Sequence, residues 1–312
     1  MSWRPNAPLE NLKARAENLA LIRRFFNDRG VMEVEVPVIG SNTVTDPQLD
    51  SLQVPGMGFL QTSPEYFMKR LLAAGSGDIY SLGKAFRADE SGRLHNAEFT
   101  LLEWYRLGLD DRALASEVVG LIQTLVPDVA VAESAYADLF QEACGLNPHR
   151  ATVEQLRQCA RQHLDVRWDD DNRNVWLDLL FTHLVEPAMP DGLQVVLDFP
   201  ASQAALARCE VNVEGDPVAR RFEIYWGGVE LANGYRELTD AREQRERFAR
   251  DNEQRVRMGK PVIDVDAGLL AALSEGLPEC AGVALGVDRL LMKVTGEAAI
   301  DQVISFAIGF AR

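Results

Sequence analysis

The sequence contains few cysteines and fewer basic than acidic residues. Its four cysteines are scattered and none belongs to a CxxC pair, which argues against a zinc site or a disulfide framework and fits a reducing cytosol. The 32 basic and 47 acidic residues give a formal net charge of −15. A protein that binds many nucleic-acid phosphates normally presents a basic face, so this balance lowers the expectation of a large tRNA or DNA footprint.

Long apolar segments are also missing from the sequence. No run of about 20 apolar residues occurs, so we expect no membrane-spanning helix. Residues 1–20 lack the apolar core of a secretory signal. These absences favour a cytoplasmic protein with no membrane partner. Hydrophobic residues make up 47% of the 312 residues and charged residues 25%, which is typical of a globular protein.

Hydrophobic periodicity and turn residues predict the order of helices and strands. Apolar residues at helical spacing predict a helix over 9–29, and the alternation of VMEVEVP predicts a strand over 31–37. A strand near 59–62 runs into Ser63-Pro64-Glu65, a typical helix start. The other predicted strands cover 79–87, 98–107, 194–199, 221–226, 229–233 and 303–310, and the other predicted helices cover about 111–125, 152–164, 172–185, 239–259 and 267–275.

The order of these elements predicts the fold class. Strands often follow strands, without regular alternation of strand and helix, so we expect an α+β fold in which helices flank an antiparallel sheet. Neither a repeat nor a low-complexity linker marks a domain boundary. We therefore expect a single domain over residues 1–312, with a helical insertion at about 110–190.

Two glutamates flank a predicted hairpin turn at Gly227-Gly228, where the positive φ of a two-residue turn suits glycine. Such a turn would pair Tyr225 with Glu230, and Glu223 with Ala232. Alternation then places Glu223 and Glu230 on one face, with Cβ atoms roughly 7–8 Å apart. Two carboxylates at this separation suit Mg²⁺, which prefers oxygen ligands. Two solvated glutamates on an exposed strand face are an equally good interpretation of the hairpin alone.

A third glutamate follows in the second strand of this hairpin. Simple alternation places Glu237 on the face opposite Glu230. Glu237 can join the two glutamates only if the strand bulges or ends near Gly234, where glycine makes this easy.

A second pair of predicted strands carries an arginine and an aromatic face. Arg87 ends the first of these strands, and its planar guanidinium suits phosphate oxygens. One face of the next strand carries Phe99, Leu101, Glu103 and Tyr105. Phe99 is suited to stacking on a base, and Glu103 with Tyr105 is suited to an ammonium group. Taken by itself, the pattern is explained more simply by an aromatic core face with a few surface charges.

The segment GVALGVDRLL (282–291) predicts an apolar strand, then Gly286, then a helix. Glycine permits the close approach of a flat ligand. Asp288 suits the positive end of the helix, whereas Arg289 does not, so Arg289 needs another role such as binding a phosphate. A packing glycine is the simpler explanation of this short motif on its own.

Together and in this order, these segments resemble the three signature motifs of class II aminoacyl-tRNA synthetases. The first helix and the strand that ends at Pro37 are similar to motif 1, which builds the dimer interface in that family. FRADESGRLHNAEFTLLEWY is similar to motif 2, and GVALGVDRL is similar to motif 3. TSPEYFMKRLL and EIYWGGVELANGYRELTDAREQRERF are similar to the lysyl branch of the family. The resemblance covers almost all of residues 10–312.

One subfamily matches better than the complete lysyl-tRNA synthetases. Those enzymes carry an N-terminal anticodon-binding barrel, whereas here the region similar to the catalytic domain begins almost at Met1. The chain is most similar to truncated lysyl-tRNA synthetase paralogues that attach (R)-β-lysine to a lysine of translation elongation factor P. DFPASQAALA (198–207) is also similar to that subfamily. The resemblance implies a homodimeric ligase that uses ATP and Mg²⁺, takes (R)-β-lysine or lysine, modifies elongation factor P and binds no tRNA stably.

The resemblance also implies roles for the matching residues. Arg87 would contact the α-phosphate of ATP and Arg289 the γ-phosphate, which makes these two the catalytic residues. The implied nucleotide-binding residues are Arg87, Asp89, His95, Asn96, Phe99, Glu230, Leu231, Gly286 and Arg289. The implied substrate-binding residues are Ser63, Pro64, Glu65, Glu103, Tyr105, Asn233, Tyr235, Glu237 and Ala284. The implied metal ligands are Glu223 and Glu230.

Three positions depart from the family pattern. Motif 2 usually reads Arg-Asn-Glu, but here Asp89 stands in place of glutamate and is one methylene shorter, so Glu90 is an alternative for the contact near adenine. Ala97 replaces the usual proline. Ala284 replaces the glycine of true lysyl-tRNA synthetases, and its methyl narrows the amino-acid pocket. Such a methyl changes discrimination by about 1–3 kcal/mol. Alanine is expected in the subfamily, which favours (R)-β-lysine.

Two other functions are compatible with the sequence. The first is a minimal lysyl-tRNA synthetase, which the acidic charge, the lack of anticodon machinery and Ala284 disfavour. The second is a catalytically inactive paralogue that binds an amino acid and regulates a partner, which the intact Arg87, Glu223, Glu230 and Arg289 disfavour.

Overall fold

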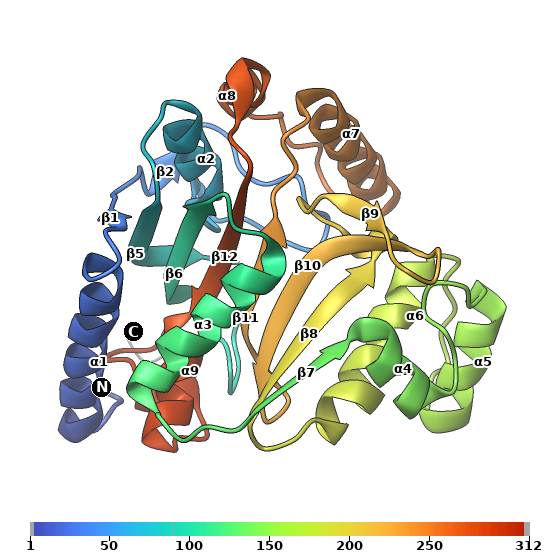
Figure 1. Ribbon diagram of the computed structural model, residues 1–312, viewed down its shortest axis with the longest axis horizontal. Coiled ribbons are helices and arrows are strands. Elements are labelled where there is room, and N and C mark those ends of the chain that lie inside the picture. The colour runs from blue at the N-terminus through green and yellow to red at the C-terminus, as the bar shows by residue number, and fades with distance from the viewer. Residues whose placement is uncertain (1–2, 89, 309–312) are drawn as a thin grey trace. The chain divides into compact units, whose positions relative to one another are not determined.

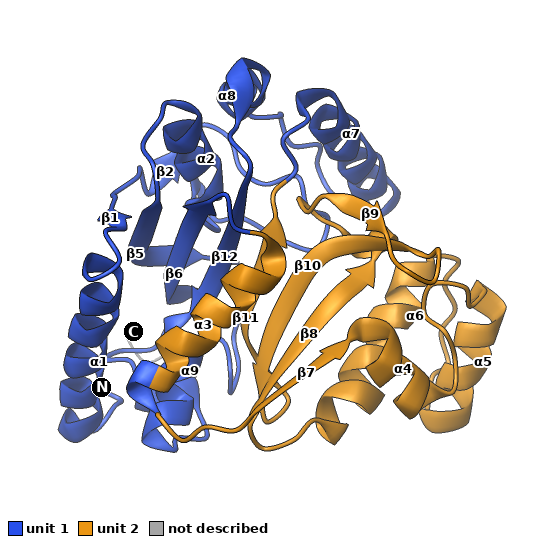
Figure 2. Cartoon of the chain, viewed as in Figure 1, with its two compact units in different colours: residues 1–109, 124–126, 238–312 blue, residues 110–123, 127–237 orange. Residues whose placement is uncertain are grey.

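The computed structural model describes residues 3–88 and 90–308. The chain divides into two compact units, one built from residues 1–109, 124–126 and 238–312 and the other from 110–123 and 127–237 (Figure 2). Antiparallel strand pairs predominate in both units and helices pack on the strands, which confirms the predicted α+β class. The expectation of a single domain stays a prediction. Within the described residues, no helix is both long and apolar enough to cross a membrane.

The main sheet of the first unit has the strand order β1-β5-β6-β12 (Figure 1). Its strands are β1 (Met32–Glu33), β5 (Ile79–Phe86), β6 (Glu98–Leu107) and β12 (Cys280–Gly286). β1 pairs parallel with β5, and the other two pairs are antiparallel. β5 and β6 match their predicted ranges almost residue for residue, whereas the strand predicted over 31–37 is only two residues long.

Helices α1 (Leu9–Asn27) and α9 (Val287–Thr295) belong to the same unit. Phe26 of α1 stacks on Tyr80 of β5 with 4.4 Å between ring centroids and meets Trp104 of β6 edge-on at 5.3 Å. Asp288 of α9 is 2% exposed, and its carboxylate accepts from the backbone N of Thr100 at 2.7 Å and from Arg15 Nη1 at 2.6 Å. An aromatic cluster and a buried ion pair therefore hold both helices on one face of the sheet.

The rest of the first unit consists of a small sheet and further helices. The sheet has the order β2-β4-β3, and its strands are β2 (Ile39–Gly40), β4 (Gly58–Leu60) and β3 (Gln53–Val54). The helices are α2 (Glu65–Ala73), α7 (Ala241–Arg257), α8 (Ala267–Gly276) and the short η4 (Ile300–Gln302).

The strand predicted over residues 303–310 is wrong for the part that the structure describes. The chain forms turns up to residue 308, and the last two predicted positions lie outside the described residues. The backbone N of Ala307 donates to the side chain of Asn6, and that of Ile308 donates to the side chain of Asn96. Side-chain amides thus take the hydrogen bonds that a neighbouring strand would otherwise provide.

The sheet of the second unit has the order β11-β10-β8-β7, with β9 also paired to β10. Its strands are β7 (Val131–Ala135), β8 (Leu193–Pro200), β9 (Cys209–Val211), β10 (Pro217–Trp226) and β11 (Val229–Arg236). The helices are α3 (Asp111–Leu125), α4 (Tyr136–Cys144), α5 (Val153–His163), α6 (Arg173–Leu180), η1 (Phe181–Val185), η2 (Glu186–Ala188) and η3 (Ala201–Gln203).

The core of the second unit is aromatic. Tyr136 of α4 stacks on Phe181 with 4.5 Å between ring centroids and lies 4.9 Å from the ring of Phe199 at the end of β8. The helix predicted over 172–185 is divided, because the chain continues from α6 into the wider π-helical turn η1. The expected insertion at about 110–190 is largely helical. It also contains two elements that the periodicity did not predict, the strand β7 and the helix α4.

Candidate active site

One face of β6 carries the predicted row of Phe99, Leu101, Glu103 and Tyr105. The residues directly opposite Phe99, Leu101 and Glu103 are small on β5: Ala85, Gly83 and Ser81. Those opposite Leu101, Glu103 and Tyr105 are small on β12: Gly286, Ala284 and Gly282. Residues that face each other across a ladder project to the same side of the sheet. The larger β6 side chains are therefore flanked by small ones on both neighbouring strands.

Glu103 is the charged residue of this row, and only 2% of its surface is exposed. The hydroxyl of Ser63 donates to Oε2 of Glu103 at 2.7 Å, and the hydroxyl of Tyr105 donates to Oε1 at 2.8 Å. Ser63 and Tyr105, both predicted substrate residues, thus orient the carboxylate from two sides. Ala284 lies directly opposite Glu103 in the ladder, so its methyl is on the same face.

The predicted helix start holds a second acidic residue. Pro64 occupies the cap position of α2, where serine was expected, but the Ser63 hydroxyl still accepts from the backbone N of Glu65 at 3.0 Å. Lys69 Nζ donates to Glu65 Oε1 at 2.6 Å, and Lys69 is only 2% exposed. The sequence reasoning missed this buried lysine, although its spacing of four residues from Glu65 on a helix was a usable signal.

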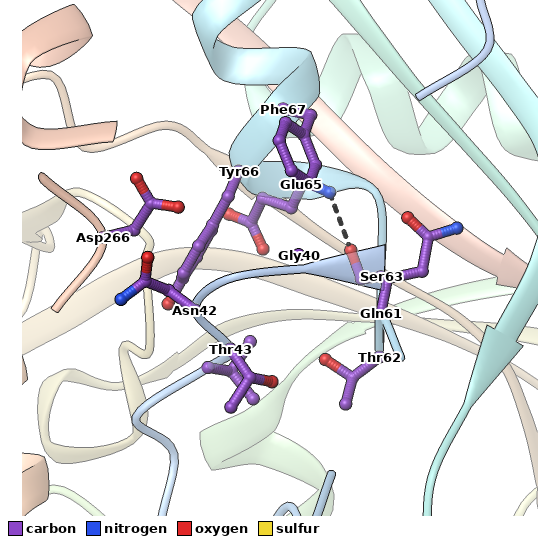
Figure 3. Close-up of a pocket in the computed structure, with 11 residues that line it drawn as sticks. Gly40, Asn42, Thr43, Gln61, Thr62, Ser63, Glu65, Tyr66, Phe67 and Asp266 are labelled. Carbon is purple, nitrogen blue, oxygen red and sulfur yellow. Dashed lines mark hydrogen bonds between the residues drawn. The ribbon is translucent and has the colours of Figure 1, made fainter. Parts of the chain in front are cut away.

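Glu65 and Ser63 line a small cavity of about 30 Å³ in the first unit (Figure 3). In Figure 3, the side chains of Asn42 and Asp266 lie on one side of the Tyr66 ring and that of Glu65 lies on the other. The lining includes the carboxylates of Glu65 and Asp266 together with hydroxyl and amide side chains. A lining of this kind suits a small polar cation such as an ammonium group.

Arg87 follows directly after β5, which ends one residue before the predicted strand end. Its Nη1 lies 3.2 Å from Glu90 Oε1, and its Cζ lies 5.1 Å from the ring centroid of Phe99. Arg87 Nε is buried and has no acceptor among the described residues. The guanidinium therefore keeps a donor available beside an aromatic ring. The predicted nucleotide residue Asp89 lies outside the described residues.

Arg289 and His95 come together although they are far apart in the sequence. Arg289 Nη2 lies 2.5 Å from His95 Nε2, and Arg289 Nε donates to the carbonyl of Leu94 at 3.3 Å. Gly286 is the N-cap residue of α9, directly before the turn that carries Arg289. The structure thus brings together two residues that the resemblance assigns to the outer phosphates of ATP.

Asn96 has a structural role in the segment between β5 and β6. It is 6% exposed, its Nδ2 donates to the carbonyl of Glu98 at 2.5 Å, and its Oδ1 accepts from the backbone N of Ile308 at 2.9 Å. The amide therefore uses both ends inside the protein, so its predicted contact with the nucleotide stays a prediction.

The carboxylate hairpin of the second unit has the predicted turn. Trp226 pairs with Val229 across Gly227 and Gly228, whose φ angles are 51° and 70°. Tyr225 pairs with Glu230, as predicted.

The predicted pairing of Glu223 with Ala232 is wrong, because Glu223 pairs with Asn233. Between Glu230 and Ala232, the residue Leu231 is an additional one without a partner in the ladder, so β11 contains a bulge. A bulge changes the side of the sheet to which all later residues project.

The bulge changes the prediction for the end of β11. Asn233 lies opposite Glu223, and Tyr235 lies opposite Arg221, so both are on the face of Glu223 and Glu230. Continued alternation puts Glu237, which is 2% exposed, on this face as well. The bulge that Glu237 requires is therefore present, although it lies at Leu231 rather than near Gly234. The side chain of Leu231 is 3% exposed and belongs to the buried core.

Glu223 is 5% exposed and accepts hydrogen bonds at both carboxylate oxygens. Arg221 Nη2 and Asn233 Nδ2 donate to Oε1, the latter at 3.0 Å, and the Tyr225 hydroxyl donates to Oε2. Burial raises the pKa of Glu223 and the nearby charge of Glu230 raises it further, whereas Arg221 opposes the rise. Neither Arg221 nor Tyr225 was predicted, although alternation from Glu223 places both on its face.

Glu223 and Glu230 are chemically suited to magnesium. Both offer carboxylate oxygens on one face of a hairpin, close enough for Glu230 to raise the pKa of Glu223 by repulsion. A divalent cation relieves such repulsion, and Mg²⁺ commonly takes one or two carboxylates together with water or phosphate oxygens. No group of three or more metal-binding His, Cys, Asp or Glu side chains occurs in residues 3–88 and 90–308. The pair therefore fits a metal that shares its ligands with a nucleotide.

Comparison with known proteins identifies the family. The model of the family "tRNA synthetases class II (D, K and N)" matches residues 1–308. Proteins named elongation factor P--(R)-beta-lysine ligase are similar along nearly their whole length. The protein of Photorhabdus laumondii is 48% identical over 98% of both chains, and that of Proteus mirabilis is 48% identical over 98% of this chain and 97% of its own. That of Yersinia pestis is 46% identical over 99% of this chain and 98% of its own. The chain therefore belongs to the class II tRNA synthetase family of the D, K and N type.

Proposed function

We propose that this protein activates (R)-β-lysine, or lysine, with ATP and transfers it to a lysine side chain of translation elongation factor P. The observation that carries the proposal is the similarity to ligases of this name at 46–48% identity over 97% or more of each chain. The same relatives support the class of enzyme, a ligase, and the family to which they are similar supports the use of ATP.

In the first half-reaction, an oxygen of the substrate carboxylate forms a bond to the α-phosphorus of ATP, and the bond to pyrophosphate breaks. Arg87 binds the α-phosphate and Arg289, with His95, binds the outer phosphates. Support comes from the buried Arg87 Nε without an acceptor in the described part of the chain and from the contact of Arg289 with His95. Arginine forks that neutralise developing phosphate charge are a common catalytic device. Phe99, beside Arg87, stacks on adenine.

The amino-acid side of the site recognises two ammonium groups. Glu103, oriented by Ser63 and Tyr105, is suited to one of them, and Glu65 beside its small cavity is suited to the other. The second unit also contributes to recognition of the ammonium groups, through Asn233, Tyr235 and Glu237. The bulge at Leu231, after which these three residues project to the same face, supports this role. Asn233 Oδ1 is a buried acceptor without a donor among the described residues, which suits an incoming N–H group.

Glu223 and Glu230 would hold Mg²⁺, which neutralises phosphate charge when it is bound. Three neighbouring side chains, Arg221, Tyr225 and Asn233, donate to Glu223 and so fix the direction of its oxygens. Alignment and charge neutralisation then suffice for the first half-reaction, and no protein nucleophile is required.

In the second half-reaction, the ε-amine of the acceptor lysine forms an amide bond to the activated carboxyl carbon, and AMP leaves with the bonding electrons. The proton released by the amine goes to solvent or to the departing phosphate. On the family resemblance, we also propose a cytoplasmic homodimer that does not bind tRNA stably.

The test is an incubation of the protein with elongation factor P, ATP and either (R)-β-lysine or lysine, followed by intact-mass measurement. We expect a mass increase of one lysyl unit, in a greater fraction of the factor with (R)-β-lysine than with lysine. Robust charging of tRNA with lysine in a parallel assay would instead identify a minimal lysyl-tRNA synthetase. Absence of ATP–pyrophosphate exchange with either isomer, in protein shown to be folded, would identify a regulatory paralogue.

A further inference from the structure

Arg221 of β10 is an arginine with several partners on the metal-binding face of the second unit. Its Nη2 donates to Glu223 Oε1, and its Nη1 donates to the carbonyl of Gln203 at 2.8 Å. Its Cζ lies 4.6 Å from the ring centroid of Phe199 and 5.9 Å from that of Tyr235. A side chain held by four neighbours keeps its guanidinium in one place.

The carboxylate beside this guanidinium has little access to water. Glu223 is 5% exposed, and a second carboxylate, Glu230, lies diagonally across the hairpin on the same face. A buried charge destabilises a fold unless a partner of opposite charge lies close to it. Arg221 supplies that partner from within the protein.

We propose that Arg221 is a resident counter-cation of Glu223: it compensates the buried carboxylate while no metal is bound and thereby makes metal binding at Glu223 and Glu230 depend on the nucleotide. This inference rests on the proposed role of these two glutamates as magnesium ligands. Arg221 is a positioning residue, because it affects the metal only through the carboxylate of Glu223.

Dependence on the nucleotide follows from competition between two cations. Glu223 has about four lone-pair positions on its oxygens, and Arg221, Asn233 and Tyr225 use three of them. A metal ion that approaches the remaining position meets the positive charge of Arg221, which weakens its binding. Phosphate oxygens add negative charge and further ligands, so Mg²⁺ binds well only together with ATP.

The neighbouring arginine is a matched control. Arg220 also pairs with a buried acid, because its Nη2 lies 2.8 Å from Oδ1 of Asp111, which is fully buried. Its other ion-pair partners are Asp198 and Glu210, at 3.4 and 3.9 Å, and not Glu223. Arg220→Gln therefore removes a comparable buried ion pair without changing the charge at the proposed metal ligands.

The experiment measures Mn²⁺ binding to the full-length protein by electron paramagnetic resonance, with and without a non-hydrolysable ATP analogue. For Arg221→Gln, we expect the half-saturating Mn²⁺ concentration without the analogue to fall about tenfold, because a repelling charge has been removed. Arg221→Lys and Arg220→Gln should bind like the wild type, which takes up Mn²⁺ well only with the analogue.

A melting curve of each variant provides the second measurement, which needs no activity. Arg221→Gln should melt roughly 5 °C below the wild type, because Glu223 loses its counter-charge. Addition of Mg²⁺ should raise the melting temperature of Arg221→Gln most of the way back to that of the wild type. Mg²⁺ should not raise a lowered melting temperature of Arg220→Gln in this way. If Arg221→Gln folds only in the presence of Mg²⁺, that result also supports the proposal.

Two results separate failure of this inference from failure of the metal assignment. Suppose that the wild type binds Mn²⁺ with the analogue, but that Arg221→Gln binds Mn²⁺ without the analogue no more tightly than the wild type does. Arg221 is then not the counter-cation, and the metal assignment stands. If neither protein binds Mn²⁺ with the analogue, Glu223 and Glu230 are not metal ligands, and both ideas are overturned.

Discussion

The two hairpins that carry most of the candidate site residues differ in how their strands are paired. The hairpin β5–β6 keeps one register from Ile79 opposite Tyr105 to Phe86 opposite Glu98. The hairpin β10–β11 has a turn of two glycines and then a bulge at Leu231. In the first hairpin, period-two alternation correctly predicts the shared face of Phe99, Glu103 and Tyr105. In the second, the same rule fails beyond Glu230.

This difference shows how a single additional residue can assemble a site. Without the bulge, residues 233, 235 and 237 would project away from Glu223 and Glu230. With it, an amide, a phenol and a carboxylate join the glutamates on one face. The regular hairpin needs no such device, because its uninterrupted register already puts Phe99, Glu103 and Tyr105 on one face.

The largest expected effect concerns the end of the regular hairpin. Arg87→Ala should lower the rate of ATP–pyrophosphate exchange about a thousandfold, because it removes a guanidinium aimed at phosphate oxygens. Exchange kinetics at saturating ATP measure this. Arg93→Ala is the control from the same segment, because Arg93 is exposed and donates to the carbonyl of Ala298. If the exchange rate of Arg87→Ala falls less than tenfold, Arg87 is not a catalytic residue.

The next prediction tests the face that the bulge creates. Glu237→Gln should lower kcat/KM for the lysine substrate about a hundredfold, since the ammonium loses a counter-charge, while the KM for ATP stays within about threefold. Glu210→Gln is the control: Glu210 pairs with Arg236, the neighbour of Glu237 on the other side of the strand, at 3.0 Å. Equal losses for both substrates of the Glu237 variant would show that the bulge does not bring Glu237 to the amino acid.

The turn of the bulged hairpin can be tested through stability. A Cβ added at Gly228, which has a φ of 70°, would lie 2.6 Å from the carbonyl oxygen of Glu186. Gly228→Ala should therefore lower the free energy of unfolding by about 2 kcal/mol, from backbone strain and the close contact. Urea denaturation measures this. Gly215→Ala, with a φ of 81° and no atom within 4 Å of the new Cβ, should lose only about half as much.

Substrate choice can be tested on the strand next to the regular hairpin. Ala284 lies opposite Glu103, so Ala284→Gly enlarges the space on that face. We expect kcat/KM for lysine relative to (R)-β-lysine to rise about tenfold, which corresponds to about 1.4 kcal/mol. Ala281→Gly is the control, because Ala281 pairs with Arg106 and belongs to the other face. If the ratio of kcat/KM for the two isomers is unchanged in the Ala284 variant, the methyl group does not contribute to specificity.

The smallest effect is expected for the hydroxyl that orients Glu103. Tyr105→Phe removes a donor at 2.8 Å from Oε1, which should raise the KM for the amino acid only several-fold, because the Ser63 hydroxyl still donates to Oε2 and keeps the carboxylate oriented. Tyr80→Phe is the control: its hydroxyl donates to Glu33 at 2.8 Å and lies on the other face of the sheet. If both variants behave alike, orientation of Glu103 by Tyr105 does not contribute to binding.

Much of the candidate site could be predicted because it depends on local rules. The glycine pair specifies the tight turn through its positive φ angles. The strands 79–87 and 98–107 follow from alternation, and the start of α2 follows from Ser63 and Pro64. Each of these features is set by residues close together in the chain, so a single sequence contains enough information.

The partners of individual side chains could not be predicted in the same way. Arg221 pairs with Glu223, Lys69 is buried against Glu65, and Arg15 pairs with Asp288, 273 residues away in the chain. A charged residue in a sequence has the same appearance whether it is solvated or buried in a pair. Only packing decides which, because the cost of removing a charge from water depends on everything around it.

By itself, the sequence determined the order of the motifs, the α+β class, the two-glycine turn and the residue types available for phosphate, metal and ammonium. Only the tertiary structure decided that Leu231 bulges, that Glu223 therefore faces Asn233, and that Arg221 lies beside that carboxylate. The physical reason is that strand register is a property of two strands together. Alternation within one strand specifies which residues share a side only until an unpaired residue exchanges the sides.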